Sequence, residues 1–463
     1  WRLGNSNNIY SGATTITQGI LMAVDGAGLS ASSNLVFDGG TLYSSGNFTR
    51  NIGTGAGEMQ FAAPANANEA EFIGGFLGGD SKLTVDWAGT PVWGATSGFI
   101  STRNGLILNG SQARAQGATG SIALSEVEIA GDFSLGTAAA TGKTIAVTTA
   151  SSSATGTVTT GDTSGLVVGQ SITGPNIASG AYIVSINSAT QFTMSANASA
   201  ATATNRDLIA NNLRTIRVDD NTNTGADTAT ISGVISAGDS VTGLRKVGNG
   251  ILKLTGANTY EGETNINQGT LAVTSLGLSG LAGTSSVGAV TVAAFGNANA
   301  VTLGNGGTGA GILQYIGAGE TSDRKIRLNS TTGSNQIHSD GSGPLILTNV
   351  ANDMAAGAKT LLLRGTNTAG NMITNQLLDH GGALGVGVDG SATWILTGDN
   401  TYSGTTTVSG GALGIGHDNA LGTGAVVLSN TTGGTVFAYG GDRVIGNAIS
   451  EANSTGAVTS FSG

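Results

Sequence analysis

Three pairs of carboxylates are the residues of this chain whose spacing could support catalysis or metal binding. The pairs are Glu69 with Glu71, Glu126 with Glu128, and Asp219 with Asp220. Residues two apart in a strand point to the same face, so both carboxylates of a glutamate pair could meet one ligand. Glycosidases and calcium sites use such arrangements. No histidine, arginine or lysine pattern recurs around these pairs, and we interpret them as parts of solvated strand faces.

Two loop-like segments resemble ligand-binding motifs only in part. Residues 219–225 read DDNTNTG, but the glycine comes one position too late for a calcium loop. The twelfth position from Asp219 is Thr230, where such a loop has glutamate. Residues 304–311 read GNGGTGAG, without the Lys-Ser or Lys-Thr of a phosphate loop. We therefore predict no metal and no cofactor, with calcium at Asp219 as the alternative.

The histidines and nucleophiles form no recognisable catalytic set. The histidines are His338, His380 and His417. They lie far apart, without metal-ligand spacing, and no Ser-His-Asp set can be argued. We therefore expect no catalytic, cofactor-binding or metal-binding residues, and we predict that the chain is not an enzyme. The alternative is a polysaccharide-degrading β-helix enzyme that uses Glu126 and Glu128.

One arginine motif and one tryptophan motif have both a structural and a functional interpretation. Arg50, Arg324 and Arg443 each follow a short apolar strand and a turn, and each precedes an isoleucine or valine by one or two residues. We expect them to cap coils or to pair across coils, although an arginine beside an aspartate could also form a site. Trp87 and Trp93 lie in DWAGTPVWG. We expect them to pack over a coil, with a carbohydrate platform as the alternative.

A repeated sequence motif of about 25 residues dominates the chain. The fold that it forms must position the candidate residues named above. Residues 247–273 read VGNGILKLTGANTYEGETNINQGTLAV, and residues 1–23 and 388–415 repeat the pattern. Its matched positions are Tyr10, Tyr260 and Tyr402; Gly12, Gly262 and Gly404; Thr14, Thr264 and Thr406; Gly19, Gly269 and Gly411. Such periodicity predicts one supersecondary unit stacked along an axis. Trp1 aligns with Trp394, and we expect the chain to be a piece of a longer protein or one repeat of a fibre.

Composition favours an all-β fold of many short strands, as in a sandwich, a barrel or a β-solenoid, and the long-range repeat favours the solenoid. Glycine accounts for 78 of 463 residues, proline for only 4, and charged residues for 10%. Many short runs alternate apolar and polar residues, and helical periodicity is almost absent. Glycine suits the corners between strands, because those corners need positive φ angles and close backbone approach. With two or three strands per coil, we expect roughly 20–35 residues per coil.

Charge and cysteine content exclude several partners. The formal net charge of −10 leaves no basic stripe for nucleic acid and argues against an anionic membrane surface. The sequence contains no run of 18 apolar residues and therefore predicts no membrane-spanning helix. The chain has no cysteine, which excludes a disulfide scaffold and a cysteine-based zinc site.

The repeat resembles a known family. LTGANTYEGETNINQGTLAV and WILTGDNTYSGTTTVSGGALGI are similar to the autotransporter-associated β-strand repeat, also called the passenger-associated transport repeat. Residues 40–61 and 311–328 resemble segments that accompany it in long bacterial surface proteins. The resemblance implies a right-handed parallel β-helix and a secreted protein at the bacterial surface or outside the cell. The repeat of that family is structural and implies no catalytic residues.

One block interrupts the repeat pattern. Residues 139–205 lack its motifs, and the flanking sequences would read continuously without the block. We therefore predict a β-solenoid over 1–138, an inserted small β domain over 139–205, and a continuing β-solenoid over 206–463. Within the block we expect strands at 181–186 and at 191–194.

These observations predict a structural component of a bacterial fibre or sheath. We expect self-association head to tail, or further repeats of the same chain. The alternative is an autotransporter-type adhesin that binds glycans or other cells through exposed faces or the inserted domain.

Overall fold

A computed structural model gives the arrangement of most of the chain, and every structural statement below refers to the residues that it describes. These are residues 1–62, 72–101, 104–109, 125–137, 144–150, 156–160, 163, 171–173, 183–194, 206–220, 227–239, 242–281, 283–290, 299–304, 309–330, 334–354, 357–429, 433–452 and 460–462. The chain divides into unit 1, Trp1–Gly262, and unit 2, Glu263–Gly463. The described residues form strands and turns, and no helix among them has the length and apolar character needed to cross a membrane.

Unit 1 consists of short strands that pair mainly in parallel. They are β1 (Thr14–Ile16), β2 (Ile20–Met22), β3 (Leu35–Phe37), β4 (Thr41–Thr49), β5 (Met59–Phe61), β6 (Phe72–Asp86), β7 (Gly105–Leu108), β8 (Val127–Ile129), β9 (Phe133–Ser134), β10 (Thr144–Ala150), β11 (Gly156–Thr160), β12 (Ser171–Thr173), β13 (Ile183–Ser188), β14 (Gln191–Met194), β15 (Arg206–Arg217), β16 (Thr228–Ile231), β17 (Ile235–Ser236), β18 (Thr242–Val247) and β19 (Ile251–Leu254). β1, β3 and β5 stack in register, as do β8, β16 and β19. Parallel pairing of successive coils is the pairing that a solenoid requires.

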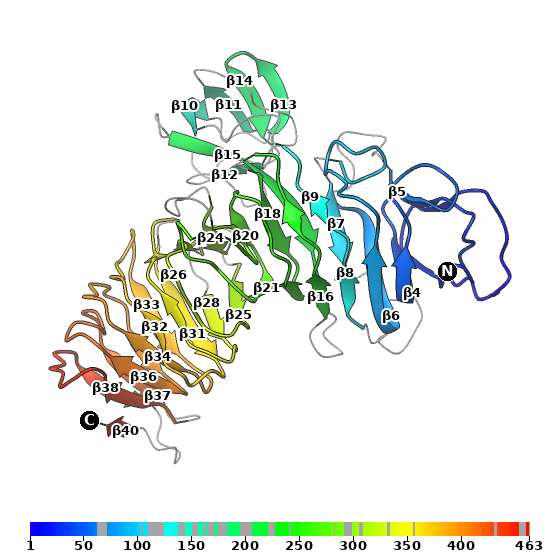
Figure 1. Cartoon of the computed structure of the whole chain (residues 1–463). Helices are drawn as coiled ribbons and strands as arrows, with labels where there is room; N and C mark the ends of the chain where they lie inside the picture. Colours follow the sequence, from blue (N-terminus) through cyan, green and yellow to red (C-terminus); the bar gives the residue numbers. More distant parts are fainter. Residues whose placement is uncertain are drawn as a thin grey trace. The chain divides into compact units, whose positions relative to one another are not determined.

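A set of antiparallel strands interrupts this parallel stack. β10 pairs with β11 and β15, and β14 pairs with β11 and β13, so that these strands form one group in Figure 1. β15 belongs to both arrangements: residues up to Asn211 pair antiparallel with β10 and β12, and Asn212 onwards pairs parallel with β18. The predicted strand at 191–194 is confirmed as β14, and residues 181 and 182 of the other predicted strand lie outside the described residues. The domain boundaries at 139 and 205 stay a prediction.

Unit 2 is a parallel stack, apart from one short antiparallel pair of strands. Its strands are β20 (Thr264–Ile266), β21 (Gly269–Val273), β22 (Thr284–Ser285), β23 (Gly288–Ala289), β24 (Val301–Leu303), β25 (Gly311–Tyr315), β26 (Glu320–Ser322), β27 (Ile326–Leu328), β28 (Ser334–Ser339), β29 (Leu345–Leu347), β30 (Val350–Ala351), β31 (Lys359–Gly365), β32 (Asn371–Ile373), β33 (Leu384–Val388), β34 (Thr393–Leu396), β35 (Thr406–Val408), β36 (Ala412–Ile415), β37 (Val426–Ser429), β38 (Thr435–Ala438), β39 (Ile449–Ala452) and β40 (Ser460–Ser462). In Figure 1 the strands of unit 2 follow one another along the stack. The predicted parallel β-helix is confirmed.

The core of unit 2 is a row of inward-pointing aliphatic side chains, one from each coil. Ile337 pairs with Leu363, Leu363 with Val388, Val388 with Val408, and Val408 with Leu428. All five side chains are buried. Successive partners are 26, 25, 20 and 20 residues apart, which agrees with the expected coil length. The alternating residues of the same strands point outward, as the two-residue period of a strand requires.

The repeat's glycines and asparagines explain why its pattern recurs. Gly19, Gly269 and Gly411 all have φ between +62° and +70°, a conformation that a side chain makes costly. The asparagine of the Asn-x-Tyr turn connects coils: the Asn400 side chain accepts a hydrogen bond from the Leu377 amide (2.8 Å) and donates one to the Ala420 carbonyl (2.6 Å). This asparagine therefore satisfies backbone groups of two neighbouring coils.

Candidate functional site

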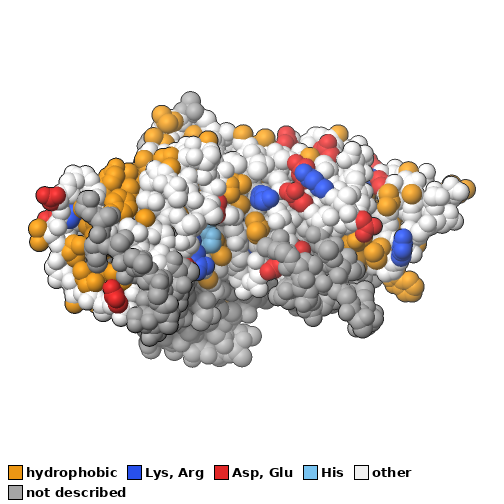
Figure 2. Space-filling view, turned by 90° about the horizontal axis from the view of Figure 1, so that it is seen from below, with side chains coloured by type: hydrophobic (Ala, Val, Ile, Leu, Met, Phe, Trp, Pro, Cys, Tyr) orange, Lys and Arg blue, Asp and Glu red, His pale blue; other side chains and the backbone are white. Residues whose placement is uncertain are grey.

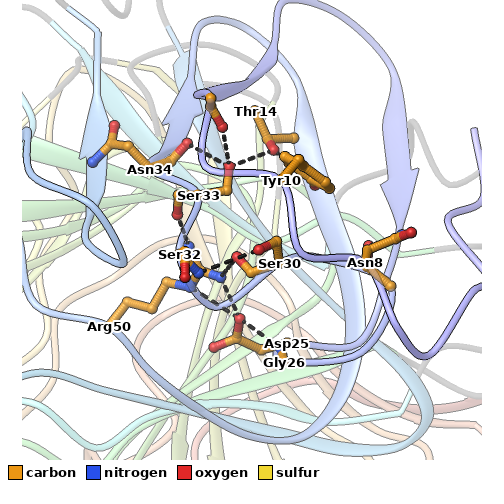
Figure 3. A network of polar contacts seen from close by, with 12 residues as sticks. Asn8, Tyr10, Thr14, Asp25, Gly26, Ser30, Ser32, Ser33, Asn34 and Arg50 are labelled. Atoms are coloured by element: carbon orange, nitrogen blue, oxygen red, sulfur yellow. Dashed lines mark hydrogen bonds and ion pairs between the residues drawn. The ribbon is translucent and has the colours of Figure 1, made fainter.

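Arg50 lies in a polar network that holds the loop after the first repeat copy (Figure 3). Its guanidinium donates to Asp25 Oδ1 (Nε at 3.0 Å), to the Ser30 carbonyl (2.8 Å) and to the Ser33 carbonyl. The Ser33 hydroxyl in turn contacts Thr14 Oγ1 at 2.7 Å. Arg50 is buried, and an arginine with several donors in a planar fork suits a loop that presents several carbonyl oxygens. Arg50 therefore caps a coil, as the structural interpretation predicts.

Arg324 has the same role after the second repeat copy. It is buried, and it donates to the carbonyls of Leu276 (2.7 Å), Asn299 (2.9 Å) and Ala289 (3.1 Å). The neighbouring Asp323 does not pair with it in these contacts but accepts a hydrogen bond from the Ser279 amide at 2.8 Å. Both side chains thus hold the loop of the preceding coil and leave no open charged site.

Arg443, the third member of the motif, is partly exposed and holds no such loop. Its guanidinium donates to the Tyr439 carbonyl at 2.7 Å and to the Ile415 carbonyl at 3.2 Å. The expectation of a capping role therefore fits Arg50 and Arg324 better than Arg443. The sequence motif is the same in all three places, but the length of the neighbouring loop differs.

The glutamates of the second carboxylate pair are engaged in contacts between coils. Glu128 forms an ion pair with Lys82 (2.7 Å), and it accepts a hydrogen bond from Ser232 Oγ. The hydrogen bond from Lys82 lowers the pKa of Glu128, whereas the general acid of a glycosidase needs a raised pKa. Glu126 accepts a hydrogen bond from Thr230 Oγ1. These contacts support the interpretation of Glu126 and Glu128 as parts of a strand face. Glu69 and Glu71 lie outside the described residues.

The candidate calcium segment is described only at its first two residues. Both carboxylate oxygens of Asp219 accept hydrogen bonds from Arg217 Nε, at 2.9 and 2.8 Å. Asp220 Oδ1 lies 3.4 Å from the Asp227 amide nitrogen. Residues 221–226 lie outside the described residues, as do 305–308 of the glycine-rich segment. Among the described residues, no group of three histidine, aspartate or glutamate side chains could hold a metal ion.

Trp87 and Trp93 are buried, so neither offers a carbohydrate platform, and that alternative is wrong. Both pack against Phe99 and Phe133 at tilted or edge-on angles. Trp87 Nε1 donates to the Asp132 carbonyl and Trp93 Nε1 to the Ser101 carbonyl. Burial of the ring with a satisfied N–H is the usual packing of tryptophan in a core.

The histidines stay apart, but His338 belongs to a cluster that the sequence did not reveal. His417 lies near Asp399, and His380 is exposed. His338 pairs in register with Gln314 of β25 and with Arg364 of β31. Burial lowers the pKa of His338, and the nearby Arg364 acts in the same direction, while Asp340 and Asp389 oppose them.

Gln314, His338 and Arg364 form one outward row. A second outward row lies beside it, and the two rows together form what we call the histidine–arginine face. The second row consists of Ile312, Gln336 and Leu362, again in register. The face is defined by Ile312, Gln314, Gln336, His338, Leu362 and Arg364, all partly exposed. No sequence signal could have located it, because the three strands are joined by turns of different lengths. On the side of the molecule in Figure 2, charged side chains are few and both signs are mixed.

Comparison with known proteins identifies the repeat. Residues 1–23, 244–273 and 388–415 match the passenger-associated-transport-repeat family, at the positions where the sequence repeats itself. The chain is also 35% identical over 171 residues to the adhesin BmaC autotransporter of Brucella suis biovar 1 (strain 1330). That match covers 36% of this chain and spans 5% of the length of the adhesin. No solved structure matches the chain.

The chain therefore carries passenger-associated transport repeats, as its sequence indicates. Both matches agree with a protein that is secreted and lies at the bacterial cell surface or outside the cell.

Proposed function

We propose that this chain is part of the exposed passenger of an adhesin and that it attaches the bacterium to other cells. The similarity to an adhesin autotransporter is the observation that carries the proposal. The fold supports it, because stacked coils present long rows of outward side chains on a scaffold with a continuous core. The proposal includes no catalytic step. Glu126 and Glu128, the best candidates for one, are paired with neighbouring coils.

Beads coated with the chain should attach to cultured epithelial cells. Beads coated with an unrelated β-solenoid of similar net charge provide the control, because an acidic rod by itself should not adhere. We expect attachment to exceed this control severalfold and to be inhibited by an excess of the free chain. Attachment equal to the control on epithelial, endothelial and bacterial cells would contradict the adhesin proposal.

Structural self-assembly is a second candidate, favoured by the exposure of the first repeat copy. Trp1 is 97% exposed, whereas the aligned Trp394 is fully buried. Tyr10 is 37% exposed, whereas Tyr260 and Tyr402 are buried. A coil of the same repeat from a second copy of the chain would cover these side chains. We propose that this face accepts such a coil.

Sedimentation velocity tests association between copies. We expect the chain to form larger species as its concentration rises, and the double variant Trp1→Ser, Tyr10→Ser to remain monomeric. Leu378→Ser, which removes an exposed apolar side chain elsewhere, is the matched control and should associate normally. A wild-type chain that stays monomeric at every concentration, with no filaments on the native cell surface by electron microscopy, would contradict self-assembly.

A further inference from the structure

The outward polar row of the histidine–arginine face, Gln314, His338 and Arg364, is held in place by polar contacts with neighbouring side chains. His338 Nε2 lies 3.0 Å from Gln336 Oε1, and Gln314 Nε2 donates to Asp340 Oδ2 at 2.8 Å. Arg364 pairs with Asp389. These contacts fix planar polar groups at the spacing of adjacent strands, about 4.8 Å. A ligand would therefore meet a preorganised array, which lowers the entropic cost of binding.

Part of the hydrogen-bonding capacity of this array is unused among the described residues. The hydrogen bonds above leave Gln314 Oε1, Gln336 Nε2 and His338 Nδ1 for a ligand. His338 lies beside carboxylates and an amide, and burial keeps it neutral at pH 7 because its pKa is lowered. A neutral imidazole offers one donor and one acceptor, and each amide offers both. The array can therefore both donate and accept hydrogen bonds at neighbouring points.

Two aliphatic side chains lie beside the polar row, one on each side of Gln336. Ile312 and Leu362 are partly exposed on strands whose alternate residues fill the core. Gly387 of β33 is the next residue in register after Leu362. A Cβ at Gly387 would lie 2.8 Å from Leu362 Cδ1, so the glycine allows the leucine to lie flat over the neighbouring strand. The face thus has two aliphatic side chains with planar polar groups between and beside them.

We propose that the histidine–arginine face binds a neutral, hydroxyl-rich glycan, and this inference rests on the adhesin proposal. A pyranose has an apolar face of C–H groups that can pack on either Ile312 or Leu362. Its hydroxyls donate and accept in turn, which matches Gln314, Gln336 and His338. Protein sites for small ligands commonly combine apolar contact with a few fixed polar groups in this way.

The charges of the face select against acidic glycans. Asp340 and Asp389 contribute two negative charges and Arg364 one positive charge, while the chain as a whole has a net charge of −10. Arg364 is already paired with Asp389, so a carboxylate on the ligand would have to compete for it. A neutral glycan meets no such opposition.

Biolayer interferometry with immobilised oligosaccharides tests the inference on the full chain. Lactose, chitotriose and mannotriose are the neutral probes, and sialyllactose is the acidic counterpart of lactose. We expect at least one neutral probe to bind and sialyllactose to bind more weakly than lactose. His338→Ala and Gln336→Ala should each weaken binding on the order of tenfold, the loss expected for one or two hydrogen bonds to the ligand. Gln376→Ala, an exposed glutamine away from the face, is the matched control and should bind normally.

The outcomes separate this inference from the adhesin proposal. The glycan site is refuted if no neutral probe binds, if sialyllactose binds as tightly as lactose, or if Gln376→Ala weakens binding as much as Gln336→Ala. Circular dichroism of each variant shows that the fold is retained. If both variants of the face attach to cells as well as the wild type, the glycan site is wrong and the adhesin proposal stands. If the chain binds a neutral probe but attaches to no cell, the glycan site stands and the adhesin proposal is wrong.

Discussion

Arg324→Ala is expected to lower the stability of the coils around residues 276–300 by roughly 3–5 kcal/mol. The substitution removes the donors for the carbonyl oxygens of Leu276, Ala289 and Asn299. Each buried acceptor that loses its partner costs about 1–3 kcal/mol, and water can satisfy some of them after the loop opens. Local stability is the quantity to measure, because stacked repeats need not unfold in one step. Hydrogen exchange of peptides from residues 276–290 should therefore become faster by several orders of magnitude.

The third arginine of the motif provides the control for this experiment. Arg443→Ala should change local stability by less than about 1 kcal/mol, because its side chain is partly exposed and water can replace its hydrogen bonds. Arg324→Lys should recover only part of the loss, since an ammonium cannot reproduce the fork of a guanidinium. Equal effects of Arg324→Ala and Arg443→Ala would show that the loop contacts contribute little.

Raising the pH from 7 to 9.5 is expected to stabilise unit 1 by about 3 kcal/mol through Lys246. Lys246 is fully buried, and its ammonium donates to the carbonyls of Val247 (3.1 Å) and Gly248. Burial lowers the pKa of Lys246 from 10.5 to about 7, and Asp219 opposes this shift. Between these two values the unfolded chain binds the proton and the folded chain does not. The free energy of unfolding therefore rises by up to about 1.4 kcal/mol per pH unit. This contribution of Lys246 is lost as the pH falls towards 7.

Lys246→Val isolates this contribution. Val388 occupies the aligned position of the third repeat copy and is buried there, so valine suits the site. The variant should lose the pH dependence between pH 7 and 9.5, as measured by urea denaturation at several pH values. Lys253→Val, which replaces a partly exposed lysine of β19, should retain it. The same slope in wild type and Lys246→Val would contradict a buried, neutral lysine.

The sequence alone determined the fold class and the reason for the repeat. Alternation of apolar and polar residues is a property of a single strand, so inward residues such as Leu313 and Ile337 can be read from it. The matched glycines Gly269 and Gly411 mark corners that need positive φ, and this need is also local.

Only the tertiary structure decided which side chains share a face. Gln314, His338 and Arg364 are neighbours because their turns set the register between coils. The spacing of paired residues varies in this unit, from 20 between Val388 and Val408 to 42 between Gly269 and Gly311. Arg324 reaches Leu276, which lies 48 residues earlier, and no local pattern predicts that contact. Trp87 and Trp93 are buried by Phe99 and Phe133 for the same reason. A two-residue period fixes the direction of each side chain, but stacking fixes its neighbours.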